Sequence, residues 1–408
     1  MGRFIIHGGK VLSGEISVGG SKNAALPIIF SCILIRGVST ITNVPDIIDV
    51  DVALDIVSSF GAKVVRQRDK VIIDTYNLTY RVPDDEAVSK IRASSYLIGA
   101  TISRFGRARL QSFGGCNFDN RPIDMHIMAA RAVGARLNGD EMYASRLIGA
   151  DIYFDKVSVG ATVNAILLTV SANGKSRIFG YAKEPHIMSL IEFLNRAGAK
   201  ITVGDDCIFV EGRELSSSYA AIIPDMIEAG TYLALSLMTD SSLRVVGADK
   251  DQLFSFINML LYGGAVIEYD ALSVMLSGNI TEEVNIETAP YPAFPTDLQP
   301  LMAPLLAVSL GGTIREGVWK NRFGYLDELS KFGVLFECGN GFTKIKKSVI
   351  RPAKAKAPDL RGGAALILAA LYADGKSEIE NSGFIKRGYS DIVNKLRIVG
   401  ADIEEYEN

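Results

Sequence analysis

One pattern of apolar and polar positions recurs six times along the chain. In each copy, two apolar residues stand seven and four positions before a glycine, and these offsets share one face of a helix. The glycine suits the residue just after a helix, where its positive φ carries no steric cost. A short strand-like run follows. The pattern predicts six helices, each with one apolar stripe, that end at Gly61, Gly134, Gly198, Gly264, Gly333 and Gly400.

A second apolar segment precedes each of these helices. It is rich in Ala and Leu and apolar on nearly every side, which is typical of a buried helix. Turns and short alternating strands separate the two kinds of helix. The chain is therefore predicted to hold six repeats of about 68 residues, each with an inner helix, an outer helix and several strands. The inner helices are expected to begin near Lys22, Arg92, Ser158, Ile227, Asp297 and Arg361.

Six repeats in 408 residues predict two domains of three repeats each, because a single hydrophobic core does not grow to this length. The turn Pro224-Asp225, before the fourth inner helix, is the natural boundary. We expect an α/β fold in which residues 21–223 form the first domain, while residues 1–20 and 224–408 form the second. The sequence has no low-complexity linker at the boundary, so we expect closely touching domains between which the chain crosses more than once.

Composition narrows the classes of function. Hydrophobic residues make up 48% of the chain, charged residues 22%, and the net charge is −3 without a basic block, so nucleic acid is not an expected partner. The longest apolar runs are about a dozen residues, short of the ~20 that span a bilayer, so no membrane association is expected. The four cysteines form no CxxC pair, and the three histidines complete no zinc spacing. Met1 to Lys10 holds no signal peptide, so we expect a cytoplasmic protein without a metal.

The expected inner helices are polar only at their N-terminal ends. Ordinary capping explains the Ser, Thr and Asp residues found there. It does not explain cations, because the N-terminal end of a helix already carries partial positive charge and unpaired N–H groups. A bound polyanion would remove this conflict, so we predict an anion site in a cleft between the domains. The four cations at these ends are Lys22, Arg92, Lys156 and Arg361.

The loop from Gly114 to Asp124 is polar and begins with two glycines. Taken alone, it could be an ordinary surface turn that contains a cysteine. Cations such as Arg121 would lower the pKa of the Cys116 thiol, which could then act as a general acid or as a nucleophile. Asp297 is a candidate general base. Burial would raise the pKa of its carboxyl group, whereas nearby cations would lower that pKa. One acid, one base and many cations predict group transfer on a phosphorylated, carboxylated substrate.

Eight motifs, in order and over essentially the whole chain, resemble the UDP-N-acetylglucosamine 1-carboxyvinyltransferase family. The lysine-asparagine helix start and the cysteine loop are the most specific of them. A related family, 5-enolpyruvylshikimate-3-phosphate synthase, shares the sixfold fold but lacks this cysteine loop. The motifs are Ser21–Pro27, Gly114–Cys116, Arg121–Asp124, Asp155–Thr162, Pro295–Asp297, Asn321–Phe323, Asp359–Arg361 and Arg387–Tyr389.

The resemblance implies a fold and a reaction. The fold is a pair of inside-out α/β barrels, with the active site in the cleft between them and the cysteine loop as its lid. The reaction moves the enolpyruvyl group of phosphoenolpyruvate to the 3′-hydroxyl of UDP-N-acetylglucosamine by addition and elimination, and releases phosphate. This is the first committed step of peptidoglycan synthesis, it needs no cofactor, and the cysteine is the target of fosfomycin.

The resemblance also implies which residues form the site. Cys116 would give a proton to phosphoenolpyruvate, and Asp297 would handle the proton of the sugar hydroxyl. The cations Lys22, Arg121 and Arg387 would surround phosphoenolpyruvate, with Asn23 beside them. The implied substrate-binding residues are Lys22, Asn23, Arg92, Arg121, Pro122, Ile123, Asp124, Met125, Lys156, Val157, Ser158, Val159, Asp297, Val318, Arg322, Asp359, Arg361 and Arg387.

The sequence departs from the family pattern at a few positions. Lys320 stands where the family usually has Glu, Phe384 and Ser390 replace polar residues, and 117–120 is bulkier and more acidic than expected. Two alternatives stay open. One is an enolpyruvyl transferase with a shikimate-type acceptor, but the cysteine loop argues against it. The other is a paralogue that binds the UDP-sugar without turnover, but the presence of Cys116 and Asp297 argues against it.

Overall fold

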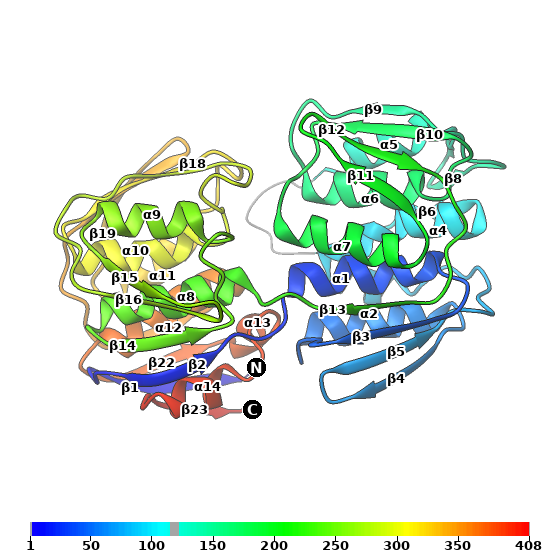
Figure 1. The fold of residues 1–408 in the computed structure, drawn as a ribbon. Helices are drawn as coiled ribbons and strands as arrows, with labels where there is room; N and C mark the ends of the chain where they lie inside the picture. The colour runs from blue at the N-terminus through cyan, green and yellow to red at the C-terminus, as the bar shows by residue number, and fades with distance from the viewer. Residues whose placement is uncertain (1, 115–121, 408) are drawn as a thin grey trace. The chain divides into compact units, whose positions relative to one another are not determined.

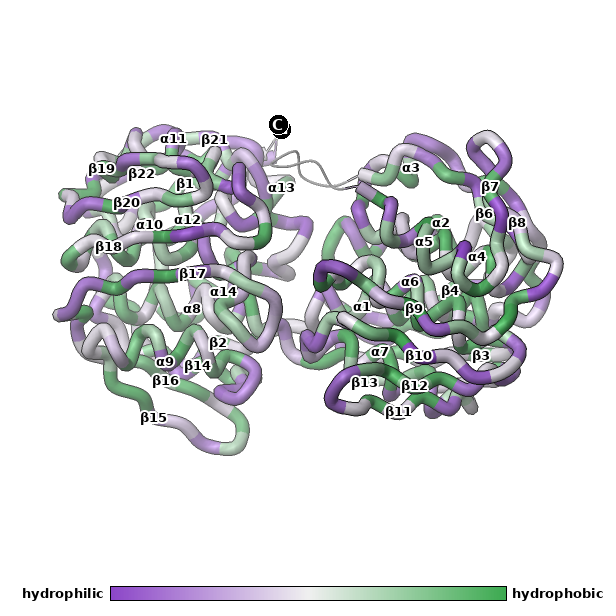
Figure 2. Tube along the Cα trace, turned by 90° about the horizontal axis from the view of Figure 1, so that it is seen from above, coloured by the Kyte–Doolittle hydropathy of each residue, from purple (hydrophilic) through white to green (hydrophobic). Residues whose placement is uncertain are grey.

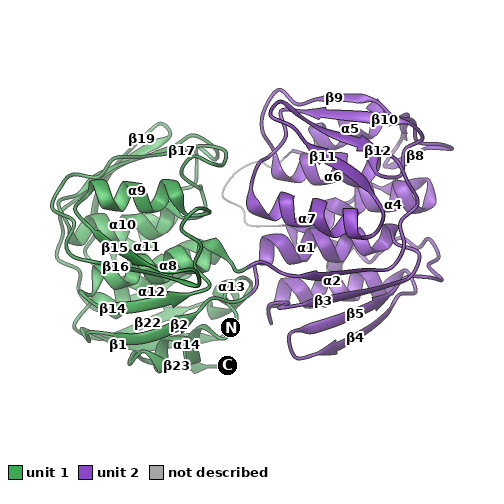
Figure 3. Ribbon diagram, viewed as in Figure 1, with its two compact units in different colours: residues 1–19, 116–119, 224–408 green, residues 20–115, 120–223 purple. Residues whose placement is uncertain are grey.

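The computed structural model describes residues 2–114 and 122–407, which divide into two compact units (Figure 3). Unit 1 contains both ends of the chain, residues 1–19 and 224–408. Unit 2 contains the described residues between 20 and 223. The N-terminal segment therefore joins the C-terminal half of the chain rather than the residues that directly follow it.

The inner helices of unit 1 pack against one another, and its sheets lie around them (Figure 1). The inner helices are α8 (Met226–Met238), α10 (Gln299–Val308) and α12 (Leu360–Tyr372), and the others are α9 (Phe254–Tyr262), α11 (Tyr325–Ser330), α13 (Ser382–Lys386) and α14 (Ile392–Ile398). One sheet has the order β15 (Val266–Tyr269), β16 (Ser273–Ser277), β14 (Ser242–Val246), β2 (Ser13–Ser17). The second has the order β17 (Ile286–Thr288), β18 (Gly312–Glu316), β20 (Phe342–Lys346), β19 (Leu335–Gly339). The third has the order β21 (Lys354–Lys356), β22 (Gly375–Glu380), β1 (Arg3–Gly8), β23 (Asp402–Tyr406).

Unit 2 repeats this plan. Its inner helices are α1 (Lys22–Ser31), α4 (Leu97–Phe105) and α6 (Val159–Thr169), its outer helices are α2 (Ile48–Ser59), α5 (Asp124–Ala132) and α7 (Pro185–Arg196), and α3 (Asp85–Lys90), η1 (Cys32–Leu34) and η2 (Arg92–Tyr96) are short. One sheet has the order β13 (Ser218–Ala221), β3 (Val38–Thr42), β5 (Lys70–Asp74), β4 (Lys63–Gln67). Another has the order β11 (Lys200–Val203), β12 (Cys207–Glu211), β10 (Lys175–Phe179), β9 (Asp151–Tyr153). The last has the order β6 (Arg107–Arg109), β8 (Glu141–Tyr143), β7 (Arg136–Asn138).

Each four-stranded sheet joins one parallel pair at its edge to two antiparallel pairs. The parallel strands β9 and β10 flank α6 along the chain, as β17 and β18 flank α10, which gives a βαβ crossover in these two repeats. In unit 1, β2 pairs with β14 and β1 lies between β22 and β23, so the N-terminal segment completes two of its sheets. The predicted inside-out α/β fold is confirmed.

Burial explains why the helices lie inside. Strands such as β10 alternate buried and exposed residues, whereas α12 is buried from Leu360 to Leu371, and Figure 2 shows apolar residues gathered on the helices. A helix that is apolar on all sides needs cover on all sides, while a strand with one apolar face can lie at the surface. The two units have separate hydrophobic cores.

The six repeat glycines occupy the conformation predicted for them. Their φ values are 98° at Gly61, 101° at Gly134, 105° at Gly198, 108° at Gly264, 94° at Gly333 and 98° at Gly400. The apolar positions before them face the cores: Leu326 and Leu329 before Gly333 are fully buried, and Ile127 and Val393 are partly buried. The sixfold repeat is therefore a feature of the structure as well as of the sequence.

The second inner helix differs from its prediction. We expected an α-helix from Arg92, but residues Arg92–Tyr96 form a 3₁₀-helix and α4 begins at Leu97. The Ser94 hydroxyl donates to the carbonyls of Val88 and Ile91, at 2.7 and 2.6 Å. Such local bonds between a serine and the backbone compete with α-helical pairing, and they tie this first turn back to α3.

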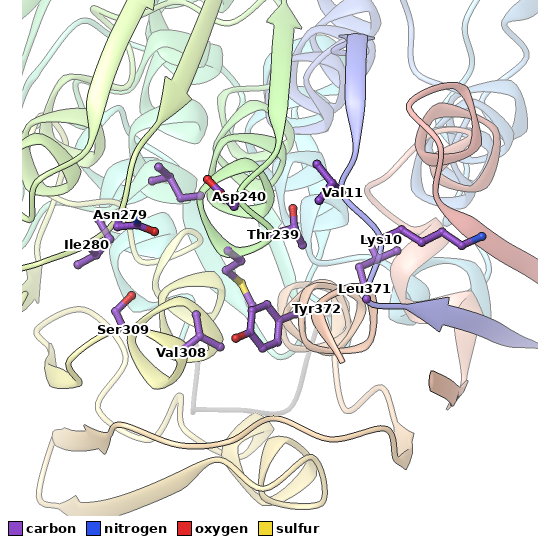
Figure 4. A pocket seen from close by; sticks show the side chains of 13 residues that line it. Lys10, Val11, Thr239, Asp240, Asn279, Ile280, Val308, Ser309, Leu371 and Tyr372 are labelled. Carbon is purple, nitrogen blue, oxygen red and sulfur yellow. The ribbon is translucent and has the colours of Figure 1, made fainter. Parts of the chain in front are cut away.

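The three inner helices of unit 1 run parallel to one another. Residues at their C-terminal ends, including Met238 of α8, Val308 of α10 and Tyr372 of α12, line one pocket of about 340 Å³ (Figure 4). At the opposite end, Asp297 just before α10 contacts Arg361 in the first turn of α12. The positive ends of the three helix dipoles therefore point the same way. Within the described residues, no helix combines the length and apolar character needed to cross a membrane.

Candidate active site

Asp297 of unit 1 lies between two arginines. Its Oδ1 accepts a hydrogen bond from Arg322 Nη1 at 2.8 Å, and its Oδ2 accepts one from Arg361 Nε at 3.3 Å. The side chains of Arg322 and Arg361 are only 4% and 2% exposed, while that of Asp297 is 31% exposed. The carboxylate is thus the accessible part of an otherwise buried charged cluster.

The two arginines decide the ionisation of Asp297. Burial alone would raise the pKa of this carboxyl, but Arg322 and Arg361 outweigh burial and hold the pKa well below its usual range. Asp297 is therefore ionised at neutral pH, and while both arginines contact it, it is a weak base.

Arg361 is held in place from several sides. It lies over the ring of Tyr389, 5.2 Å from the centroid, and the Tyr389 hydroxyl shares a 2.8 Å hydrogen bond with Thr231 of α8. Asp359 caps α12, because its Oδ1 accepts from the N–H groups of Arg361 and Gly362 at 2.9 and 3.0 Å. Arg361 Nη1 is buried and has no hydrogen-bond acceptor among the described residues.

Glu316, at the end of β18, organises the loop that leads to Arg322. Its side chain is buried and accepts hydrogen bonds from Thr288 Oγ1 at 2.5 Å, Thr296 Oγ1 at 3.0 Å and the N–H of Val318 at 2.9 Å. Thr296 in turn accepts from Arg322 Nη1 at 3.0 Å. Val318 and Arg322 were predicted from the sequence, but Glu316 was not.

In unit 2, Lys22 is the first residue of α1 and pairs with Asp49 of α2. The Lys22 Nζ to Asp49 Oδ2 distance is 2.6 Å, and both side chains are largely buried. Asn23 follows directly on the same helix. Asp49 balances part of the positive charge that Lys22 adds to the N-terminal end of α1, and the sequence pattern did not single it out.

A buried polar cluster supports the segment 122–125, which leads into α5. Arg92 Nη2 donates to the carbonyl of Pro122 at 3.4 Å. His126 is 3% exposed, and its Nδ1 lies 2.7 Å from Asn164 Nδ2. Burial and the nearby Arg92 lower the pKa of His126 to about 4. The histidine is therefore neutral, and because the Asn164 amide is the donor, the ring proton lies on Nε2.

Asn164 links three elements through one side chain. Its Oδ1 accepts from the N–H of Gly99 in α4 at 2.6 Å, and its Nδ2 also donates to the carbonyl of Ser95 at 3.1 Å. Neither His126 nor Asn164 was predicted as part of the site. The available signal was a single amide in α6, an inner helix whose other polar side chains are threonines.

The remaining predicted positions surround these clusters or lie outside the described residues. Ser158 caps α6, accepting from the N–H of Ala161 at 3.3 Å, with Lys156 and Val157 exposed beside it. Arg387 is the residue that caps the C-terminal end of α13, and a Cβ at the next residue, Gly388, would come within 2.6 Å of the end of the Leu360 side chain in α12. Cys116 and Arg121 fall in the stretch 115–121, which the structure does not describe.

The chain is similar to known proteins over nearly its whole length. A family profile described as EPSP synthase (3-phosphoshikimate 1-carboxyvinyltransferase) matches residues 6–396. The chain is 40% identical to a UDP-N-acetylglucosamine 1-carboxyvinyltransferase of Halothermothrix orenii, covering 99% of this chain and 100% of the relative. It is 41% identical to UDP-N-acetylglucosamine 1-carboxyvinyltransferase 2 of Clostridium acetobutylicum, covering 99% of each.

The chain belongs to the UDP-N-acetylglucosamine 1-carboxyvinyltransferase family. It is accordingly a transferase, as the resemblance of its motifs implied.

Solved structures agree with this family and fold. The enolpyruvyl transferase NikO from Streptomyces tendae has a TM-score of 0.89 at 26% identity, covering 99% of each chain. The EPSP synthase of Acinetobacter baumannii has a TM-score of 0.76 at 15% identity, covering 100% of each, and shows a shared fold. For a UDP-N-acetylglucosamine 1-carboxyvinyltransferase family member, the charged helix ends described above are the natural place to look for the active site.

Proposed function

We propose that this chain transfers the enolpyruvyl group of phosphoenolpyruvate to the 3′-hydroxyl of UDP-N-acetylglucosamine and releases phosphate, the first committed step of peptidoglycan synthesis. The observation that carries the proposal is the carboxylate of Asp297 held between the buried Arg322 and Arg361, in a chain about 40% identical to enzymes with that name. Both substrates are charged metabolites that do not cross membranes unaided, so we assign the activity to the cytoplasm.

The helix ends of unit 1 suit the anionic substrates. The N-terminal ends of α10 and α12 meet at Asp297 and Arg361, and N–H groups at such ends bind phosphate and carboxylate groups. Arg361 Nη1 adds a donor that has no acceptor among the described residues. We assign the charges of phosphoenolpyruvate to Lys22, Arg121 and Arg387, with Asn23 beside them. We assign the UDP-sugar to Arg92, Asp297, Val318 and the segments 121–125 and 156–159.

Asp297 can accept the proton of the sugar hydroxyl only if its pKa rises on substrate binding. Its pKa is low because two arginines contact it. When one arginine turns from Asp297 to a substrate anion, that stabilisation is lost and the carboxylate becomes a better base. The negative charge of the bound substrate would in this way make Asp297 a stronger base. Asp297 would become the base that the reaction needs only in the enzyme–substrate complex.

The bond changes follow from these assignments. In the addition step, the 3′-oxygen bonds to C2 of phosphoenolpyruvate, Asp297 takes the hydroxyl proton, and Cys116 gives a proton to the C3 methylene. In the elimination step, the Cys116 thiolate takes back a C3 proton, the C2–C3 double bond forms again, and the C2–oxygen bond to phosphate breaks, with the proton held by Asp297 passing to the leaving phosphate. Protons and bonds balance among the substrates and side chains, so the sequence of steps requires no cofactor.

Phosphate release tests the proposal directly. The protein is incubated with phosphoenolpyruvate and UDP-N-acetylglucosamine, and phosphate is followed over time. Release only with shikimate 3-phosphate would instead support the acceptor named in the matching family profile. Calorimetric binding of UDP-N-acetylglucosamine without any release would identify a non-catalytic binding protein.

The role of Cys116 has its own test. If the residue acts as a proton donor, Cys116→Asp keeps turnover within about tenfold of the natural protein, since a carboxylic acid can also donate, and abolishes inactivation by fosfomycin. Cys116→Ser, which is too weak an acid, is the matched control and loses turnover. An inactive Cys116→Asp variant that still binds UDP-N-acetylglucosamine would show that the thiolate is needed as a nucleophile.

A further inference from the structure

Among the described residues, the chain passes between the two units at Gly19–Gly20 and at Ile223–Pro224 (Figure 3). We call residues 17–23 and 222–226 the crossing segments. The Asp225 N–H donates to the Gly19 carbonyl at 2.9 Å, and the Ser21 N–H donates to the Ile223 carbonyl at 2.7 Å. The first bond lies in unit 1 and the second in unit 2. The crossing segments are therefore hydrogen-bonded to each other on both sides of the crossing, and they form one two-stranded ribbon.

A buried carboxylate holds the ribbon on the side of unit 1. Glu228, in the first turn of α8, accepts hydrogen bonds from the Gly19 N–H at 2.8 Å, the Tyr232 hydroxyl at 2.7 Å and Lys395 Nζ at 2.6 Å. The Glu228 side chain is 2% exposed and that of Lys395 is 17% exposed. Burial raises the pKa of Glu228, and Lys395 opposes this; three donors around one carboxylate favour its ionised form.

Unit 2 holds the same ribbon with backbone and amide contacts. Asn43 Nδ2 donates to the Ile222 carbonyl at 2.7 Å, and the Ile222 N–H donates to the Thr42 carbonyl at 2.9 Å. A Cβ at Gly20 would lie 1.8 Å from the Asn43 carbonyl oxygen, so this contact admits only glycine. At the Gly19–Gly20 crossing, the residue on each side therefore contacts its own unit.

Stability alone does not explain the Glu228–Lys395 pair. A buried ion pair recovers little more than the cost of taking both charges out of water, and apolar residues of the same volume often stabilise a fold equally well. An apolar side chain at position 228, however, could not accept the hydrogen bond of the Gly19 N–H. That bond fixes the backbone three residues before Lys22, the first residue of α1.

We propose that Glu228, charge-balanced by Lys395, is a positioning residue that holds the backbone of Gly19, three residues before Lys22 at the start of α1. Lys22 and Asn23 follow at once, so their placement toward substrate depends on this anchor. The consequence for catalysis rests on the proposed function; the anchoring of the crossing segments does not.

Variants of the full chain can separate an anchor from an ordinary core contact. The variant Glu228→Leu/Tyr232→Phe/Lys395→Met removes the three side-chain polar groups together, and is expected to fold because no buried charge is left unpaired. Tyr232→Phe alone is the matched control, since it leaves the contacts of Glu228 with Gly19 and Lys395 intact. Glu228→Gln, which keeps the shape and one acceptor, is the second variant should the triple change not fold.

Hydrogen–deuterium exchange of the crossing segments is the first measurement, and the KM for phosphoenolpyruvate and kcat are the second. In the triple variant we expect exchange of the Gly19 and Asp225 amides to accelerate about tenfold or more while that of α10 stays unchanged. We expect kcat/KM to fall about tenfold, mainly through KM. Glu228→Gln should show the same local change at smaller size, and Tyr232→Phe should match the natural protein.

The exchange data decide the proposal without any substrate. Unchanged exchange at Gly19 in the triple variant, or equal acceleration throughout unit 1, would make Glu228 an ordinary core residue and overturn the proposal. Local acceleration with unchanged kcat/KM would contradict the link to Lys22 and Asn23. If the natural protein releases no phosphate from the two substrates, the proposed function fails while the exchange result still stands.

Discussion

At the scale of single residues, the Asp297 carboxylate balances two buried arginines. Asp297→Asn keeps the size of the side chain but leaves Arg322 and Arg361 facing a neutral amide. We expect turnover to fall by about 10²–10⁴-fold, because both the base and its charge are lost. Steady-state phosphate release measures this. Asp402→Asn, which removes an exposed partner of Lys10, is the control and should leave turnover unchanged; equal losses in both variants would contradict the assignment.

His126 gives a prediction about pH. Its pKa is about 4 in the folded protein against 6.5 for an ordinary histidine. Between these values the unfolded chain binds a proton that the folded protein does not, so stability falls as pH decreases from 6.5 toward 4. From pH 7.5 to 5.0 the loss for this residue is about 2 kcal/mol. Urea unfolding of the natural protein and of His126→Gln, which cannot titrate, should differ by that amount; identical pH dependence would contradict the buried neutral histidine.

At the scale of elements, the repeat glycines act through backbone conformation. Gly400 has a φ of 98°, and a Cβ there would meet no atom within 4 Å, so Gly400→Ala isolates the conformational cost from steric contact. We expect the change to destabilise unit 1 by about 1–2 kcal/mol. Gly324 also has open space around it but lies in the right-handed helical region, with a φ of −59°. Gly324→Ala should therefore be neutral or stabilising. Thermal unfolding of the two variants and of the natural protein measures both effects.

The elements also show how far the sequence could predict the structure. The apolar stripe of each outer helix and the glycine that follows it involve residues within a dozen positions of one another. Both features were therefore predictable from the sequence. Asp49, Glu316 and Asn164 were not, because each acts on a partner from another element: Lys22, Thr288 or His126. Local spacing does not encode such pairings. The 3₁₀ turn at Arg92 had the same cause, since Ser94 bonds to the carbonyl of Val88, six residues earlier.

At the scale of the whole molecule, the N-terminal segment completes sheets whose other strands come from the far end of the chain. Strand β1 lies between β22 and β23, and its Phe4 and Ile6 are fully buried in the core of unit 1. The first residues to be made are thus among the last to find their partners. Unit 1 cannot complete its third sheet until Asp402–Tyr406 are available.

This arrangement predicts which unit a core substitution weakens. Phe4→Ala, near the N-terminus, should destabilise unit 1, whereas Phe30→Ala, only a short way along the chain, should destabilise unit 2, each by about 3–5 kcal/mol. Hydrogen–deuterium exchange under mild denaturant measures both units at once: Phe4→Ala should accelerate exchange in α8, α10 and α12, and Phe30→Ala in α1, α4 and α6. Because the two cores are separate, each change should leave the other unit nearly as protected as before. Acceleration of α1, α4 and α6 by Phe4→Ala would mean that the two units unfold as a single cooperative body.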